Sequence, residues 1–243
     1  MSNRFIAITF AAVIVVPLFT LSACPSITGS PLFRVKHIAF EGLSLLDPDE
    51  ISVLSGISAE TNLYEVDLNK IVSRIEAHPM VRNARIVRYP PDEVLITIVE
   101  RTPISLINLE VLCGIDEEGT LLPFHPTFVD LPVITGVQLG GNYTLGRPVS
   151  EPELLSCLDL LKKTRGDAPE LWDQISEVRH GQDMIRINLV GDGLEVRMNP
   201  WDVLSQSEKF RAWSDANGWT ELPDFIDLRF DGQVIVRRTK KGS

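Results

Sequence analysis

The chain has 243 residues and a formal net charge of −10, and 44% of its residues are hydrophobic. That length accommodates two small domains, since domains usually run on the order of 100 to 150 residues. The acidic balance argues against a nucleic-acid partner, because duplex binding depends on Lys and Arg that neutralise phosphates.

The N-terminal segment is a candidate membrane anchor. Residues 5–23 are almost wholly apolar, and Arg4 is the only charge before them. A stretch of about 19 residues can just span a hydrocarbon core of about 30 Å. We therefore expect a single transmembrane helix at 5–23, a cytoplasmic stub at 1–4 and a linker at 24–32.

A cleaved lipoprotein signal is the alternative interpretation of this segment. Leu21, Ser22 and Ala23 precede Cys24, as in a bacterial lipoprotein box, although the apolar region of a signal peptide is usually shorter than this one. Both interpretations place the folded part outside the cytoplasm and tethered to a membrane.

The first folded segment begins with a strand and two helices. Phe33, Val35, Ile38 and Phe40 predict a half-buried strand that ends at Glu41-Gly42. A first helix is predicted to begin at Asp47-Pro48, with Asp47 as N-cap and proline at the first helical position, and to end at Gly56. A second helix is predicted to begin at the cap Asp67 and to end near His78, because Pro79 disfavours helical geometry in the residue before it.

From Val81 the apolar period changes from helical to alternating, which predicts a hairpin of two strands. Ala84 and Ile86 lie in the first strand, and Ile96 and Ile98 lie in the second. Residues 89–92 between them are of the types that favour a turn. The predicted order over residues 33–101 is β-α-α-β-β.

A second, strand-rich region follows Pro103. Helices are predicted at 151–165 and 202–213. A strand is predicted around 104–112, and residues 115–121 are predicted to form a hairpin whose turn is acidic and contains Gly119. Further strands are predicted at 175–179, 184–190 and 194–198, with Gly191-Asp192-Gly193 as a tight hairpin turn.

Particular residues occur along the chain in a fixed order: Phe33, Val35, Glu41-Gly42, Asn62-Leu63-Tyr64, His78-Pro79-Met80-Val81, Ala84, Tyr89-Pro90, Ile96, Ile98, Glu100-Arg101, Pro103, Leu131-Pro132-Val133-Ile134-Thr135-Gly136 and Phe225-Ile226-Asp227-Leu228-Arg229-Phe230. In these residues the chain resembles the bacterial cell-division family FtsQ/DivIB, whose first domain is a POTRA domain. The resemblance implies an α+β fold: a POTRA domain at 33–102, a β-rich α+β FtsQ-type domain at 103–238 and a basic tail at 239–243.

The resemblance also implies a function and a docking site. FtsQ proteins are non-enzymatic scaffolds of the division septum in the inner membrane, and they recruit the septal peptidoglycan machinery together with FtsB-like and FtsL-like bitopic partners. The family docks FtsB on its C-terminal strand. The matching partner-binding positions here are Arg229, Phe230, Asp231, Gly232, Val234 and Val236. The POTRA domain is expected to contact other division proteins. If Cys24 is instead a lipidated N-terminus, the alternative function is a POTRA-bearing lipoprotein that handles outer-membrane or secreted chains.

No catalytic, cofactor or metal site is predicted. The acidic run Asp116-Glu117-Glu118 is typical of a solvated hairpin tip, and the four histidines are scattered without metal-ligand spacing. We expect no small-molecule substrate.

The three cysteines leave two alternatives open. If Cys24 is lipidated or lies in the membrane, Cys113 and Cys157 remain to pair in an oxidising compartment. Both could equally be unpaired small apolar groups in the core.

Overall fold

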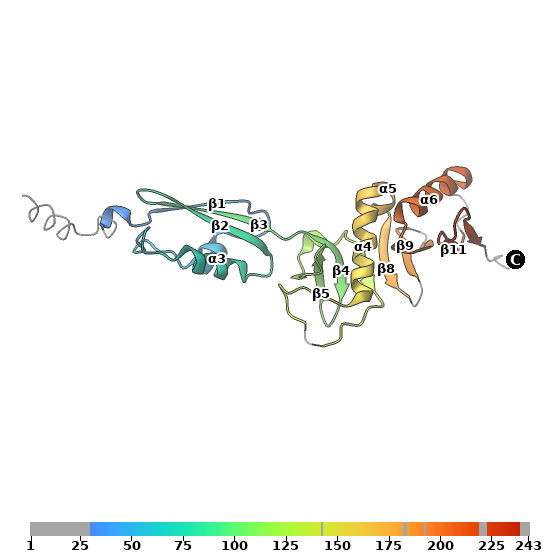
Figure 1. The fold of residues 1–243 in the computed structure, drawn as a ribbon, viewed down its shortest axis with the longest axis horizontal. Helices are drawn as coiled ribbons and strands as arrows, with labels where there is room; N and C mark the ends of the chain where they lie inside the picture. The colour runs from blue at the N-terminus through green and yellow to red at the C-terminus, as the bar shows by residue number, and fades with distance from the viewer. Residues whose placement is uncertain (1–29, 142, 182–183, 192, 219–222, 239–243) are drawn as a thin grey trace, which may run out of the picture. The chain divides into compact units, whose positions relative to one another are not determined.

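A computed structural model describes residues 30–141, 143–181, 184–191, 193–218 and 223–238. The expected stub and anchor, most of the linker, and the basic tail at 239–243 lie outside the described residues. The chain divides into two compact units (Figure 1). The first contains residues 1–76 and 83–100, and the second contains residues 77–82 and 101–243.

The first unit has the predicted β-α-α-β-β order. Its elements are β1 (His37–Glu41), α2 (Pro48–Ser55), α3 (Leu68–Glu76), β2 (Val81–Tyr89) and β3 (Glu93–Glu100). They form a three-stranded sheet in the order β1-β3-β2, with β1 parallel to β3. The helices lie against one face of this sheet (Figure 1), and Ile51, Ile75 and Ile96 are fully buried.

The predicted caps are observed in both helices. The Asp47 side chain accepts a hydrogen bond from the Asp49 N–H at 2.8 Å, and Pro48 takes the first helical position. Gly56 ends α2 in the left-handed region, with φ of 63°. The Asp67 side chain accepts a hydrogen bond from the Lys70 N–H at the start of α3.

The first strand starts later than predicted. Pro31–Phe33 is a 3-10 turn, and β1 begins only at His37. The backbone before it is paired elsewhere: Phe33 O accepts from Leu63 N at 2.7 Å, and Val35 N donates to Thr61 O at 3.0 Å. This segment is therefore extended but bound to the loop between the two helices, which an alternating apolar pattern cannot distinguish from sheet pairing.

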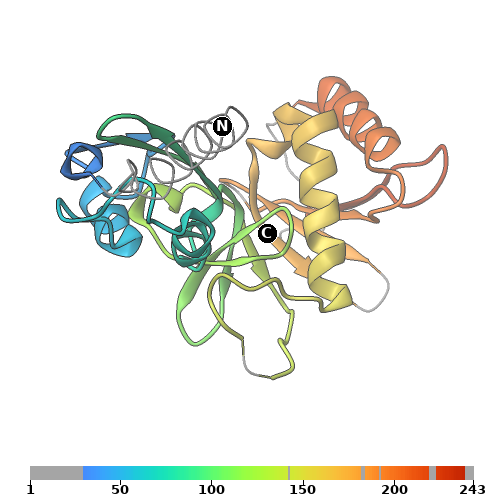
Figure 2. The same ribbon diagram turned by 60° about the vertical axis from the view of Figure 1, so that its left-hand side comes forward.

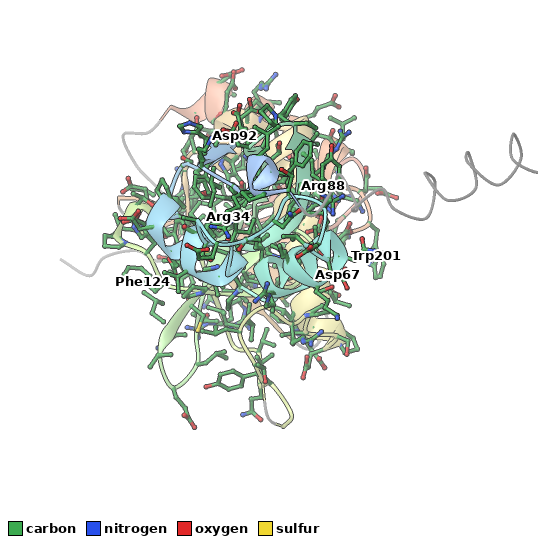
Figure 3. The ribbon with its side chains drawn as sticks, turned by 90° about the vertical axis from the view of Figure 1, so that its left-hand side faces the viewer. Arg34, Asp67, Arg88, Asp92, Phe124 and Trp201 are labelled. Atoms are coloured by element: carbon green, nitrogen blue, oxygen red, sulfur yellow. The ribbon has the colours of Figure 1, made fainter. Side chains whose placement is uncertain are left out.

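A half-buried arginine holds that same loop. The Arg88 guanidinium, in β2 (Figure 3), donates hydrogen bonds to Leu63 O and Val66 O, both at 2.6 Å. The loop that links the helices is thus tied to the sheet by polar contacts as well as by the burial of Leu63.

The second unit is built on a nine-stranded sheet with the order β12-β11-β10-β9-β8-β7-β4-β5-β6. Its strands are β4 (Pro103–Asn108), β5 (Leu112–Asp116), β6 (Leu121–Pro123), β7 (Val133–Thr135), β8 (Ile175–His180), β9 (Ile185–Leu189), β10 (Glu195–Met198), β11 (Phe225–Asp227) and β12 (Ile235–Arg237). A 3-10 turn, η3 (Pro126–Phe128), precedes β7.

The helices of this unit are α4 (Pro152–Asp167), α5 (Pro169–Trp172) and α6 (Val203–Asn217). Helices α4 and α5 follow β7 and lead into β8, its parallel neighbour, while α6 connects the parallel pair β10 and β11. Each crossover has to pass over a face of the sheet. Both α4 and α6 pack into the same core as the sheet residues Val178, Ile187 and Val196 (Figure 2).

Both described cysteines are free and belong to that core. Cys113 is 1% exposed and Cys157 is 0% exposed. The alternative in which they are small apolar groups is therefore confirmed, and the disulfide is not formed. Phe210 and Trp213, both on α6, are also buried in this core.

Candidate partner-binding edge

The last described strand, β12, lies at one end of the nine-stranded sheet. It pairs antiparallel with β11, so that Val236 stands opposite Ile226 and Ile235 opposite Asp227. No described strand flanks β12 on its other side. An edge strand presents unpaired backbone N–H and C=O groups, which another extended chain can use for pairing.

The opposite end of the same sheet is already covered. The N–H of Leu121, in β6, donates to Arg147 O at 3.2 Å, and its carbonyl accepts from Gly146 N at 2.7 Å. Thr120 and Pro148 form an antiparallel bridge beside this contact. The chain thus closes its own β6 edge with a loop, whereas the described part of the chain does nothing comparable at β12.

The two faces of the β12 segment differ. Val234 and Val236 share a face, as the alternation predicts, and they pack half-buried against the core. Ile235, between them, is 41% exposed, and Arg237 is exposed as well. The side chains available for contact along the strand are therefore Ile235 and Arg237, rather than the two valines.

An ion pair fixes the turn before β12. The Asp227 Oδ1 accepts hydrogen bonds from the Arg229 Nε at 2.9 Å and from the Arg229 backbone N–H at 3.2 Å, while Oδ2 accepts from a terminal guanidinium nitrogen at 2.8 Å. The Asp227 side chain is only 6% exposed and that of Arg229 is 22% exposed. The guanidinium of the predicted contact residue Arg229 is thus committed largely to ordering its own turn.

The protonation of Asp227 depends on this pair. Burial alone would raise the pKa of its carboxyl, but the hydrogen bonds from Arg229 and the charges of Arg229 and Arg197 outweigh burial, so the pKa lies below its ordinary value. Asp227 is therefore a carboxylate at neutral pH, and its charge matches the guanidinium that it holds.

Helix α6 supports the turn through Lys209. The Lys209 ammonium donates to Phe230 O at 2.9 Å and to Leu228 O at 3.3 Å. The Gln233 N–H also donates to Phe230 O, which closes the turn. Phe230 as a whole is 46% exposed. Its carbonyl is held by Lys209 and Gln233, while its side chain is not buried in the core. Phe230 is therefore not a buried core aromatic.

The remaining predicted positions complete the turn. Asp231 and Gly232 are exposed, and Gly232 has a φ of 65° with open space around it. All six predicted partner-binding residues therefore lie in one short segment beside the free edge. Sequence reasoning missed Asp227 and Lys209 as supports of this segment; the Asp-x-Arg spacing was a signal for the first, and nothing local indicated the second.

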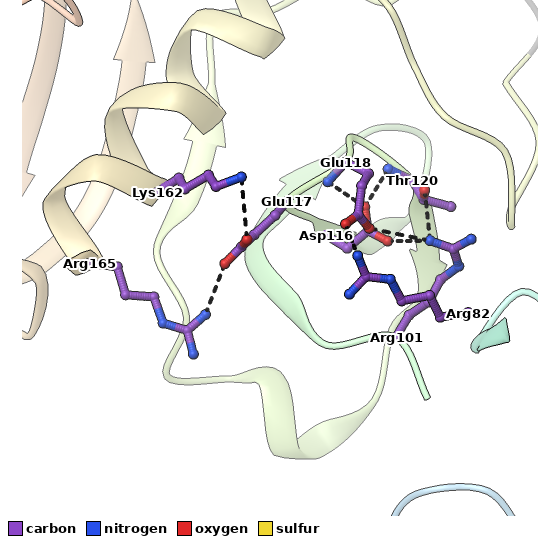
Figure 4. Close-up of polar contacts among 8 residues, drawn as sticks. All are labelled: Arg82, Arg101, Asp116, Glu117, Glu118, Thr120, Lys162 and Arg165. Atoms are coloured by element: carbon purple, nitrogen blue, oxygen red, sulfur yellow. Dashed lines mark hydrogen bonds and ion pairs between the residues drawn. The ribbon is translucent and has the colours of Figure 1, made fainter. Parts of the chain in front are cut away.

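The acidic run at 116–118 belongs to a structural network of the second unit (Figure 4). Asp116 is 2% exposed, and its Oδ2 accepts a hydrogen bond from Arg101 at 2.7 Å. Glu118 pairs with Arg82, and Glu117 lies 3.7 Å from cations of both Lys162 and Arg165. The expectation of a merely solvated hairpin tip is wrong for Asp116, because Arg101 compensates its burial.

Among residues 30–238 outside the gaps noted above, no group of three or more His, Cys, Asp or Glu side chains is arranged to hold a metal ion. None of the described helices combines the length and the apolarity needed to cross a membrane.

Comparisons with known proteins cover most of the chain. Residues 33–101 match the family model described as POTRA domain, FtsQ-type. Those residues are therefore similar to POTRA domains of the FtsQ type. The matched range includes the whole observed β-α-α-β-β unit, from before β1 to the end of β3.

The similarity extends well beyond the POTRA domain. The cell division protein FtsQ of Syntrophotalea carbinolica is 28% identical over 214 residues, which cover 86% of this chain and 75% of that protein. FtsQ of Myxococcus fulvus is 28% identical over 177 residues, covering 71% and 61%. FtsQ of Geotalea daltonii is 24% identical over 218 residues, covering 87% and 78%. The resemblance to FtsQ proteins that the sequence motifs indicated is confirmed.

Proposed function

We propose that the chain is a non-enzymatic cell-division scaffold that holds its partners by strand addition at β12. The single observation that carries the mechanism is that no described segment covers β12, at one end of a nine-stranded sheet, whereas the chain itself covers the other end. An added strand gains affinity from backbone hydrogen bonds and specificity from alternate side chains. The cell-division role is supported by the relatives, which carry the name cell division protein FtsQ.

The proposed partners are FtsB-like and FtsL-like bitopic division proteins, which link the chain to septal peptidoglycan synthesis. One such partner adds a strand to β12 and contacts the turn at Arg229, Phe230, Asp231 and Gly232. The POTRA domain contacts other division proteins.

Residues 5–23 anchor the chain in the inner membrane at the division septum, with its folded units on the extracytoplasmic side. Partners in the same membrane meet at high effective concentration, so that a contact of modest intrinsic affinity suffices.

Phe230→Lys tests this proposal without removing the supports of the turn. The carbonyl of Phe230, which accepts from Lys209 and Gln233, is retained in the variant, and residue 230 is already 46% exposed. Phe124→Lys is a matched control, because Phe124 is 42% exposed and lies on another surface loop of the same unit (Figure 3).

The assay is affinity capture of the FtsB-like and FtsL-like proteins from crosslinked membranes by the full-length chain. We expect capture by the wild-type chain and by Phe124→Lys, and loss of capture by Phe230→Lys. Equal capture by all three chains would remove the turn from the proposed docking site.

A further inference from the structure

One end of the first unit carries a group of exposed apolar residues. The 3-10 turn before β1, the loop between α2 and α3, and the turn between β2 and β3 all lie at this end (Figure 1). Leu32 is 60% exposed and Tyr89 is 49% exposed. We call the group the apolar tip, and its members, all exposed, are Pro31, Leu32, Tyr64, Tyr89, Pro90 and Pro91.

Contacts between the three segments make the apolar tip a fixed surface of the fold. The rings of Phe33 and Tyr64 meet edge to face, with centroids 5.1 Å apart. The Lys36 N–H donates to Asp92 O at 2.8 Å, which ties the turn between β2 and β3 to the chain just before β1. The Arg88 guanidinium binds the loop between the helices, as described above. The tip is therefore presented as one preformed surface rather than as three separate loops.

The charges around the apolar tip are balanced. Segments 30–37, 58–66 and 88–93 contain three basic and four acidic residues. Arg34 forms an ion pair with Glu60 at 3.1 Å, and Lys36 forms one with Asp92 at 2.7 Å. This end of the unit thus has no surplus of positive charge with which to attract anionic lipids or nucleic acid. Its distinguishing property is exposed apolar and aromatic surface, which in soluble units marks a contact site for a protein or a membrane.

The position of the apolar tip along the chain favours a membrane. Six residues, 24–29, separate Ala23, the last residue of the apolar stretch, from Ser30, the first described residue. The seven steps from Ala23 to Ser30 span at most about 25 Å when fully extended and about 15 Å on average in a flexible chain. The headgroup layer adds about 5–7 Å to each side of the hydrocarbon core. An anchor at 5–23 therefore keeps the tip within reach of the headgroups at all times.

We infer that the apolar tip rests in the interfacial layer of the membrane, with Leu32 at the acyl boundary and the phenol groups of Tyr64 and Tyr89 among the lipid headgroups. Tyrosine suits this layer because its ring is apolar and its hydroxyl can still form hydrogen bonds. The three prolines of the tip lack the N–H group that would have to leave water. Tethering raises the effective concentration of lipid, so that a weak contact suffices.

This inference rests on the proposed anchor at 5–23 and goes beyond it, because a tether alone does not require the folded unit to touch the bilayer. The contact fixes which end of the first unit faces the membrane. The strands then lead away from the bilayer: Val99, near the end of β3, lies seven residues beyond Asp92, or about 23 Å at 3.3 Å per residue. A label near Val99 is thus outside the headgroup layer when the tip is docked.

The test uses the full-length chain with Cys24→Ser, reconstituted into phosphatidylcholine vesicles and labelled with bimane at one introduced cysteine. Glu65→Cys places the label beside Tyr64 without removing a tip residue, and Val99→Cys is the matched control, because both positions are exposed in the same unit. The two described native cysteines are buried, so labelling of the folded chain spares them. The readout is quenching of bimane by a lipid that carries a nitroxide on its headgroup. Alkaline carbonate extraction of the same vesicles reports separately on the anchor.

We expect the label at position 65 to be quenched by the lipid and the label at position 99 to be spared. Tyr89→Glu should lower the ratio of docked to undocked chains by about tenfold, because a carboxylate resists leaving water. Leu32→Glu, on a different segment, should have the same effect. Val53→Glu is the matched control, since Val53 is exposed on α2 outside the tip, and it should leave quenching unchanged. Added phosphatidylglycerol or raised salt should also change little, because the tip has no basic surplus.

Equal quenching at positions 65 and 99, in chains that stay with the vesicles through carbonate extraction, would overturn the inference and leave the anchor standing. Release of the chain by carbonate would overturn the anchor and the inference with it. Quenching that appears only with anionic lipid and disappears with salt would contradict an apolar contact. A label at position 65 that is shielded from aqueous iodide but not quenched by the lipid would mean that protein, and not the membrane, covers the tip.

Discussion

The Asp227–Arg229 pair should contribute far more to stability than an exposed ion pair of similar length. Replacing either residue by Ala leaves the other charge buried without a partner, which costs on the order of 3–5 kcal/mol for fully buried pairs. The Arg229 side chain is still 22% exposed. Each single variant is therefore expected to lower the free energy of unfolding by about 3 kcal/mol, the lower end of that range. The double variant contains neither charge, and it should lose about 4 kcal/mol rather than the sum of the two single losses. The coupling free energy of the pair is then about 2 kcal/mol.

Tryptophan fluorescence during urea unfolding measures this coupling, because Trp172, Trp201, Trp213 and Trp219 all belong to the second unit. With a slope of about 2 kcal/mol per molar urea, each single variant should lower the midpoint by about 1.5 M. The control cycle is Asp159→Ala with Lys163→Ala: that pair is 2.7 Å apart, but its side chains are 48% and 40% exposed, which predicts a coupling of about 0.5 kcal/mol or less. A coupling for Asp227–Arg229 as small as that of the control would refute the reasoning.

Two further predictions concern protonation. The pKa of the Asp227 carboxyl is lowered in the folded state. The stability that its charge contributes is therefore complete above the ordinary Asp pKa near 4 and is lost as pH falls through the lowered folded pKa. Wild type should lose more stability below about pH 4 than Asp227→Ala, and identical acid unfolding profiles would contradict this. Burial raises the pKa of the Cys157 thiol to about 12, so iodoacetamide should leave Cys157 unmodified in the native chain and alkylate it in urea without any reductant; a requirement for reductant would mean that a disulfide is present after all.

Local chemistry was sufficient to predict the first unit. Asp47-Pro48 begins a helix and Gly56 ends it because capping and backbone strain act within a few residues. The exception is the start of β1. Phe33 and Val35 have strand character, but their backbone pairs with residues 61–63, and no local pattern identifies a pairing partner.

The second unit was less predictable because its pairings join distant segments. Strand β7 lies parallel to both β4 and β8, and β11 lies parallel to β10 across a helix. The buried Asp116 was also missed, because its compensating Arg101 lies 15 residues away in the sequence. Hairpins such as β9–β10 follow from local turn signals, whereas parallel neighbours do not.

The candidate site shows the same limit at the level of single residues. Alternation predicts that Val234 and Val236 share a face, but it cannot say which face is buried. The register does: Val236 stands opposite Ile226, which is 0% exposed, so the valines turn inward and Ile235 turns outward. A register shift of one residue would reverse this assignment.

Hydrogen–deuterium exchange of the full-length chain, alone and co-purified with the FtsB-like and FtsL-like proteins, tests strand addition most directly. Addition of a partner strand pairs the outward backbone groups of β12, so exchange in the peptide covering Val234 to Arg237 should slow markedly in the complex. The exchange of β6, whose edge the loop at 144–148 already covers, should not change. Protection confined to the POTRA strands, with unchanged exchange at β12 in the bound chain, would contradict the proposed docking edge.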